Sequence, residues 1–467
     1  MRYPLLLTLP LLAGACTVGP DYHRPAVPGE TGGWIAPAAS APVDRAPWRS
    51  LGDPLLTSLI DRALAANPDI AEADSRLREA RAMRDAAAGR ALPELDANGS
   101  AQKQQLSRNG QLPVGAIPGF DRRFSLFDLG FDASWEIDLW GGTRRAVEAS
   151  GRQVESAAAQ AEDMRLRIAA EVARTYADLR AAQGLAASTQ ADADAQTGIA
   201  RLVHQRFAAG EASRLDDSRA AAAARTAIAQ IPAFEADARA AIYSLATLLG
   251  QPPETLLPEL SPPVPLPATP AHVALGLRSD LLRRRPDVRA AEADLAAATA
   301  NIGVETARLF PSFSLIGGIG QQARNVGDIL SAGSTRFQVG PSLHWPIFDA
   351  GRIRADIRAA DARADQAAAR YTKAVLAALA DSETAANRYA AAQTAAHESE
   401  AALAASRQSL TLARQRFQTG EDDLLTLLQA ESSYRDADRA AIQSRQQALA
   451  TYIALIKALG GPANRSE

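Results

Sequence analysis

The chain has 467 residues, is rich in alanine, contains only 5% aromatic residues and carries a formal net charge of −3. A charge this close to neutral argues against a nucleic-acid partner. The five histidines lie far apart, without an HExxH motif or paired Cys/His spacing, so we expect no metal and no cofactor. The sequence also contains no P-loop and no GxSxG motif, and we therefore expect no enzymatic activity.

The first fifteen residues have the layout of a signal peptide. Arg2 precedes an apolar run, and small residues lead to Cys16, the only cysteine. The run is shorter than the roughly 20 residues of a membrane-spanning helix, and no later segment reaches that length. Ala13-Gly14-Ala15 also suits ordinary export cleavage, but we favour lipidation (palmitate included) because the single thiol lies where a lipoprotein needs it.

Two long stretches of the chain repeat each other. Residues 67–95 align without gaps with residues 285–313, a shift of 218, whereas Trp135 and Trp345 begin matching segments at a shift of 210. The difference, 218 − 210 = 8, predicts a longer loop in the first half. Each half reads as a short helix, two strands, a very long helix and a second helix.

The strands have the clearest pattern. Residues 127–139 alternate strictly between apolar and polar side chains, which predicts one face in oil and one in water. The polar positions of this strand are Asp128, Asp132, Glu136 and Asp138, together with glycine and serine. A half-buried strand of a soluble sandwich is the alternative. Four strands separated by long helices cannot close a sandwich alone, whereas three chains would supply twelve strands for a barrel.

The long helices are expected at residues 141–208 and 352–419, which contain no proline and have apolar residues at heptad spacing. At about 1.5 Å per residue, 68 residues reach roughly 100 Å. A cytosolic coiled coil is the alternative, but an export signal and strands of membrane length do not belong to one.

A connector with eight prolines between Pro252 and Pro270 separates the halves, and we expect it to be extended. Each long helix ends in a matching motif, RFAAGE at residues 206–211 and RFQTGE at residues 416–421. Gly210 and Gly420 fall where a left-handed helix end reverses the chain.

These segments resemble the TolC-like outer-membrane factors, most closely the OprM/NodT-type lipoproteins that serve resistance-nodulation-division efflux pumps. The resemblance is carried by CTVGPDYHRP, the paired NPDI and RPDV segments, QIPAFEADARAAIYSLATLLGQPP, and RFQTGEDDLLTLLQAESSYRDA. It covers almost the whole mature chain.

The resemblance implies a mainly α fold with a membrane β-barrel portion, formed by a homotrimer with a twelve-stranded barrel and a twelve-helix periplasmic tunnel. The expected organisation is a signal peptide at 1–15, a lipidated N-terminal and equatorial segment at 16–66, a first repeat at 67–250 (hairpin 95–137, helices 141–208 and 211–249), a Pro-rich equatorial connector at 251–284, a second repeat at 285–460 (hairpin 313–347, helices 352–419 and 421–460), and a tail at 461–467.

The implied function is a passive exit duct in the outer membrane that works with a periplasmic adaptor and an inner-membrane pump. A duct for type I secretion and a periplasmic coiled-coil scaffold are the alternatives. The acidic side chains expected to line the barrel lumen and favour cations are Asp128, Asp132, Glu136 and Asp138. Solvated polar filler is an equally good interpretation of any one of them. The expected gate residues are Leu425, Gln429, Glu421, Asp422, Asp423, Asp216 and Asp217, where Gln429 replaces the Asp usual in the family and Leu425 alternatively belongs to a helix core. The expected adaptor-docking residues are Arg206, Phe207, Gly210, Glu211, Arg416, Phe417 and Gly420.

Overall fold

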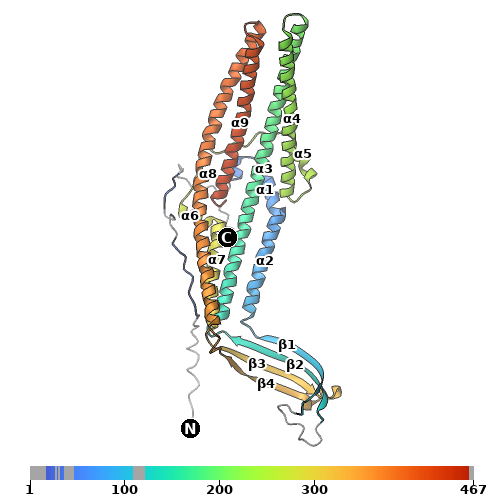
Figure 1. Ribbon diagram of the computed structural model, residues 1–467, viewed down its shortest axis with the longest axis vertical. Coiled ribbons are helices and arrows are strands. Elements are labelled where there is room, and N and C mark those ends of the chain that lie inside the picture. The colour runs from blue at the N-terminus through green and yellow to red at the C-terminus, as the bar shows by residue number, and fades with distance from the viewer. Residues whose placement is uncertain (1–16, 27–28, 30–31, 36–46, 109–120, 462–467) are drawn as a thin grey trace. The chain divides into compact units, whose positions relative to one another are not determined.

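The computed structural model describes residues 17–26, 29, 32–35, 47–108 and 121–461 (Figure 1). The expected signal peptide and the lipidation site Cys16 lie outside these described residues. The chain divides into two compact units, one of residues 1–26, 76–157 and 291–371, the other of residues 27–75, 158–290 and 372–467.

The first unit contains an antiparallel sheet with the strand order β1-β2-β3-β4. Its strands are β1 (Glu94–Gln105), β2 (Arg123–Ile137), β3 (Ser312–Ala323) and β4 (Thr335–His344). The hairpins of the two repeats are joined where β2 pairs with β3, as in the pair Gly130 and Gly320. A Cβ atom on Gly130 would lie 2.7 Å from the carbonyl oxygen of Ile319, so this pairing requires glycine.

The helices follow the order expected of two repeats. The first repeat has α2 (Pro68–Gly89), α3 (Gly142–Ala208) and α4 (Arg214–Leu248), and the second has α7 (Pro286–Ala307), α8 (Arg352–Thr419) and α9 (Leu424–Ala458). Pro232 lies inside α4 without ending it. Among the described residues, no helix is both long and apolar enough to cross a bilayer.

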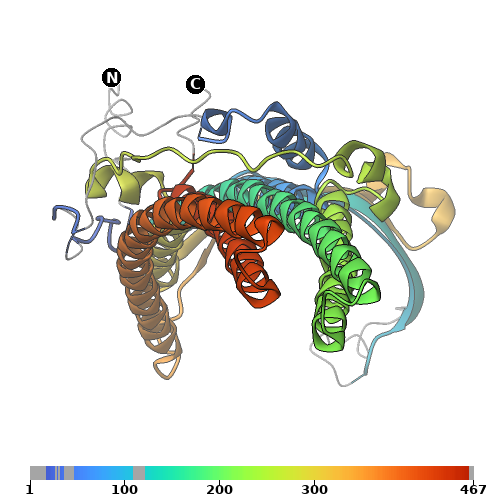
Figure 2. The ribbon, with the colours of Figure 1, turned by 90° about the horizontal axis from the view of Figure 1, so that it is seen from above.

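The connector is only partly extended, which corrects the sequence-based expectation. It begins with η3 (Pro253–Leu256) and α5 (Leu257–Leu260) and ends with α6 (Arg278–Arg284). Prolines lie at the first or second position of η3 and α5, where proline is compatible with a helix. Figure 2 shows the stretch between α5 and α6 on the same side of the helices as α1 (Pro54–Ala66), a helix that the sequence did not predict.

Equivalent side chains join the helices in the two repeats. In the second unit, Asn67 Nδ2 donates to the carbonyl of Leu248 at 2.8 Å, and Arg285 Nη1 donates to the carbonyl of Ala458 at 3.1 Å. Asn67 and Arg285 are related by the shift of 218, and their acceptors by the shift of 210 (458 − 248). Each therefore ties the end of α4 or α9 to the start of α2 or α7.

The tryptophans identified in the sequence form a second equivalent pair, within the first unit. Trp135 Nε1 donates to the carbonyl of Ala91 at 2.9 Å, just beyond α2, and Trp345 Nε1 donates to the carbonyl of Leu309 at 3.1 Å, just beyond α7. Trp135 lies in β2 and Trp345 directly follows β4, so each bond ties the segment after a short helix to the sheet.

Replacing Asn67 tests the helix junction. Asn67 Oδ1 also accepts from the backbone N–H groups of Asp69 and Ile70, so Asn67→Ala removes both the cap of α2 and the tie to Leu248. We expect a loss of about 1–2 kcal/mol, measured as a lower thermal unfolding midpoint of the purified protein. Asn67→Ser is the control because serine keeps an N-cap acceptor, and it should lose less. Equal midpoints for the two variants would contradict the capping role.

Candidate functional site

One face of the sheet is apolar and exposed. The strand register places the side chains of Leu129, Phe131, Ile319, Phe337 and Val339 on this face. All five are classed as exposed, and Phe337 is 78% exposed. Large apolar side chains gathered on one sheet face indicate a surface that another apolar phase covers.

The opposite face is polar, and its acidic residues are partly neutralised. Asp128 accepts from Arg336 Nη2 at 2.7 Å and Nε at 3.0 Å, and also from Gln322. Asp132 accepts from Asn98 Nδ2 at 2.6 Å. Glu136 is exposed on the same face. Arg336 thus compensates Asp128 from a strand 208 residues away, which the sequence did not predict, and the expected preference of this face for cations stays a prediction.

Asp138 belongs to a helix start and lies beyond the end of β2. Its carboxylate accepts from the backbone N–H of Thr143 at 3.1 Å and of Arg144 at 2.9 Å, the first residues of α3. A carboxylate at a helix N-terminus satisfies unpaired N–H groups and interacts favourably with the helix dipole. The expected role of Asp138 on the strand face is thus replaced by a capping role.

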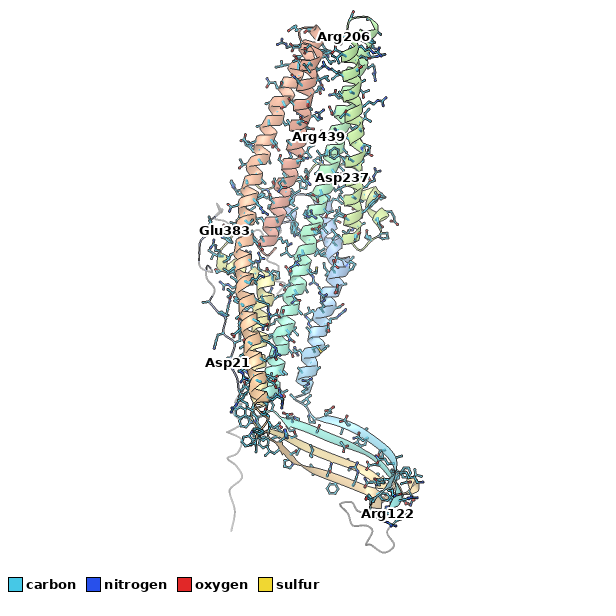
Figure 3. The ribbon with its side chains drawn as sticks, in the orientation of Figure 1. Asp21, Arg122, Arg206, Asp237, Glu383 and Arg439 are labelled. Carbon is cyan, nitrogen blue, oxygen red and sulfur yellow. The ribbon has the colours of Figure 1, made fainter. Side chains whose placement is uncertain are left out.

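The two helix turns have the same backbone structure, in the second unit. Gly210 and Gly420 have φ angles of +78° and +79°. The N–H of Glu211 donates to the carbonyl of Arg206 at 2.8 Å, and that of Glu421 donates to Arg416 at 2.9 Å. This pattern is a Schellman motif, so the predicted left-handed helix ends are confirmed. Figure 3 shows Arg206 at the turn between α3 and α4.

The acidic residues near the turns mostly have local partners. Asp422 pairs with Arg416 at 3.0 Å, and Glu421 lies 3.9 Å from the same guanidinium. Asp217 lies 3.1 Å from His204 Nδ1, and Asp216 accepts from the Ser213 hydroxyl at 2.7 Å.

Asp423 is the N-cap of α9. Its carboxylate accepts from the backbone N–H and from the hydroxyl of Thr426, both at 2.8 Å. These hydrogen bonds lower the pKa of Asp423. Asp423 therefore has a structural function that the sequence reasoning did not assign to it.

Leu425 and Gln429 lie one helical turn apart on α9, and both are exposed. Leu425 is 50% exposed, whereas Leu427 is 3% exposed and belongs to the core between the helices. Leu425 therefore lies outside the core of the single chain. Leu424 and Leu427 fill that core instead.

The two phenylalanines of the repeated motif have different environments. Phe417 is 6% exposed, and the guanidinium carbon of Arg206 lies 4.9 Å from the centre of its ring. Phe207 is 36% exposed. Only Phe207 is accessible to a partner, and Phe417 instead packs the α3/α4 hairpin against the α8/α9 hairpin.

A group of buried charges between the helices was missed by the sequence reasoning. Glu431 is buried and pairs with Arg414 at 2.8 Å, while Asp192 lies 3.7 Å from Arg435. Burial raises the pKa of Glu431, with Arg414 acting in the opposite direction. The sequence signal was present, because Glu431 continues the apolar spacing of Leu424 and Leu427 on α9. Across the described residues, no cluster of His, Cys, Asp and Glu could hold a metal ion.

Comparisons with known proteins agree with this arrangement. The family model for outer membrane efflux proteins matches residues 59–251 and 277–461. The chain is 32% identical over 465 residues to the pyoverdine export outer membrane protein OpmQ of Pseudomonas aeruginosa, covering 99% of this chain and 97% of that relative. Its fold is similar to that of the outer-membrane channel OprN, with a TM-score of 0.86, 36% identity, and coverage of 96% of this chain and 99% of the other. The open state of the Neisseria gonorrhoeae MtrE outer membrane channel gives a TM-score of 0.83 at 27% identity, covering 96% and 98% of the two chains.

Proposed function

The chain belongs to the outer membrane efflux protein family, and we propose that three copies form a gated exit duct for small molecules. The duct would receive its cargo from a periplasmic adaptor and an inner-membrane pump of the resistance-nodulation-division type. The exposed apolar face of the four-stranded sheet is the observation that carries this proposal.

Closure of the sheet is the physical reason for a trimer. β1 and β4 are the edges of the sheet in the described chain, and each pairs with only one neighbour. In hydrocarbon, an unpaired strand edge leaves backbone groups without hydrogen bonds, so spanning strands form closed barrels. Twelve strands from three chains would close the barrel, with the apolar face toward lipid and the face of Asp128, Asp132 and Glu136 toward the lumen. A periplasmic coiled-coil scaffold would not require a sheet with an exposed apolar face.

The gate is proposed at Leu425 and Gln429, whose side chains are exposed on one face of α9 near the turn. Negative charge near the gate would come from Glu421, Asp422, Asp216 and Asp217. Nearby partners, Arg416 and His204 among them, would reduce this negative charge. Because Asp423 caps α9, it would hold the gate helix in place, and its lowered pKa would keep the carboxylate ionised.

Channel recording tests the duct and its gate. We expect purified wild-type protein in planar bilayers to open rarely and Leu425→Ser/Gln429→Ser to raise the open probability severalfold, because the apolar constriction is removed. Leu412→Ser is the matched control, since Leu412 is a similarly exposed leucine on α8, and it should behave as wild type. If the folded double variant shows no channel openings, the duct proposal is wrong.

The lipid anchor at Cys16 is supported by the residues that follow it. Thr17 packs against Gly141, where an added Cβ would lie 2.9 Å from the Thr17 Cα atom. The N–H of Val18 donates to the carbonyl of Trp140 at 3.1 Å, and Trp140 stacks on Phe310 at 4.7 Å. The chain after Cys16 is thus held beside aromatic rings near the end of the sheet, where an acyl chain could enter the membrane.

Labelled palmitate tests the anchor. Wild-type protein and Thr17→Ser should both incorporate the label in cells, whereas Cys16→Ala should not, because it lacks the thiol. Equal labelling of Cys16→Ala and wild type would exclude lipidation at this residue.

Adaptor docking is proposed at the turns, chiefly at Phe207 and Glu211. Gly210 and Gly420 would shape the two turns, while Arg206, Arg416 and Phe417 would support the surface from within.

Drug tolerance tests the docking proposal. Phe207→Ala should lower the tolerance of cells severalfold while the amount of protein in the outer membrane stays unchanged, because an exposed apolar anchor is lost. Leu376→Ala, which removes an exposed leucine from α8 far along the chain from the turn, should leave tolerance unchanged. Unchanged tolerance with Phe207→Ala would contradict docking at this residue.

A further inference from the structure

A hollow lies in the second unit where α9 ends and α7 begins, between α3 and α8. Its volume is about 550 Å³. Small side chains, among them Ala385, Ala450 and Ala454, form part of its wall. The hollow exists because two helices meet end to end here, while α3 and α8 continue past the junction.

Arg285 lines the hollow, and its guanidinium is engaged with other protein groups. Its guanidinium donates to Asp287 at 2.7 Å and to the carbonyls of Ala458 and Ala378, and it lies 3.6 Å from Asp381. Asp287 has a lowered pKa, because Arg285 outweighs the effect of burial. Arg285 is therefore a structural residue of the junction, with little capacity for a further ligand.

In the part of the chain that the structure describes, two of the cationic side chains that line the hollow have no acidic partner. Arg167 pairs with Asp163 at 2.6 Å. Arg388 and Lys457 also line the hollow and are exposed, and no hydrogen bond or ion pair of either is recorded among the described residues. Glu171, the acidic residue that Lys457 influences, is bound by Arg174 at 2.7 Å. Four cationic and three acidic side chains line the hollow, a net charge of +1 (4 − 3), because Asp287 and Asp381 share Arg285. Arg388 and Lys457 are the cations of this lining that are available to a ligand.

The hollow opens on the face of α9 that carries the proposed gate residues. Gln447 and Ala454 line it and follow Leu425 by 22 and 29 residues (447 − 425 and 454 − 425), close to whole numbers of turns at about 3.6 residues per turn. The other side of α9 faces the N-terminal segment, since the Tyr452 hydroxyl donates to the carbonyl of Pro47 at 3.3 Å. If Leu425 faces the tunnel, the hollow does too.

The first repeat provides an internal comparison. The equivalent junction carries the neutral Asn67 in place of Arg285. At the shift of 210, the counterparts of Arg388 and Lys457 are Asp178 and Thr247 (388 − 210 and 457 − 210). The two available cations are therefore specific to the second junction, and helix stacking alone does not require them.

We propose that this hollow binds small organic carboxylates with an apolar body, as a transient site on the tunnel wall. The carboxylate would lie between Arg388 and Lys457, and the apolar body against the alanine wall. This inference rests on the proposed function, because it takes the gate face of α9 as the face that lines the tunnel.

Fluorine NMR of purified protein in detergent tests the proposal, with 4-fluorobenzoate as the probe and 4-fluorobenzylammonium as its counterpart of opposite charge. We expect wild-type protein to bind the carboxylate in preference to the ammonium compound. Arg388→Gln/Lys457→Gln should weaken carboxylate binding by at least about fivefold, because two charge contacts are lost.

Arg363→Gln/Lys373→Gln is the matched control. It removes the same net charge from exposed positions of α8 that do not line the hollow and should change the affinity by less than about twofold, as expected for solvent-screened charges. An unchanged thermal midpoint identifies the variants as folded. A double variant that binds the carboxylate as wild type does, or a wild type that prefers the ammonium probe, overturns the proposal.

This binding measurement is independent of conduction. Carboxylate binding by a protein that never conducts in bilayers would leave this site standing and count against the duct. Conduction by a protein that does not bind the carboxylate would support the duct and count against this site.

Discussion

Backbone hydrogen bonding in hydrocarbon is the constraint on which the arrangement depends. A sheet of four strands with an apolar outer face cannot leave its edges unpaired in a membrane. One chain alone would therefore be incomplete in a membrane, which is why the proposed duct needs three. Alternation of apolar and polar residues orients each strand, and Trp135 and Trp345 fix where the short helices end against the sheet.

The duplicated halves share their backbone structure and differ in their chemistry. Both turns have the same Schellman motif, yet Phe417 is buried under Arg206 while Phe207 is accessible. Both helix junctions are tied by a side chain, yet one is neutral and the other cationic. The repeat thus provides the shared fold, and differences at a few matched positions would provide separate roles in docking, gating and cargo contact.

Local patterns made much of the fold predictable. The two-residue period predicted β2, the glycines predicted both helix ends, and the shifts of 210 and 218 related the residues that later proved structurally equivalent. Contacts between distant segments were not predictable in this way. The pair of Asp128 and Arg336 joins two strands from different repeats, and the burial of Phe417 depends on a neighbouring hairpin. The capping roles of Asp138 and Asp423 were missed, because the sequence alone does not show which backbone N–H groups a carboxylate beside a helix start will bond.

The contacts of Arg285 have an evolutionary consequence. One guanidinium holds the start of α7, the end of α9 and a carbonyl of α8, whereas Asn67 joins only two helices. A shorter side chain at position 285 could not reach all three helices, so several compensating changes would be needed to replace it. The side chain of Asn67 bonds to residues of two helices, so fewer coordinated changes would be needed to replace it. Drift after the duplication would therefore have been freer at the first junction than at the second.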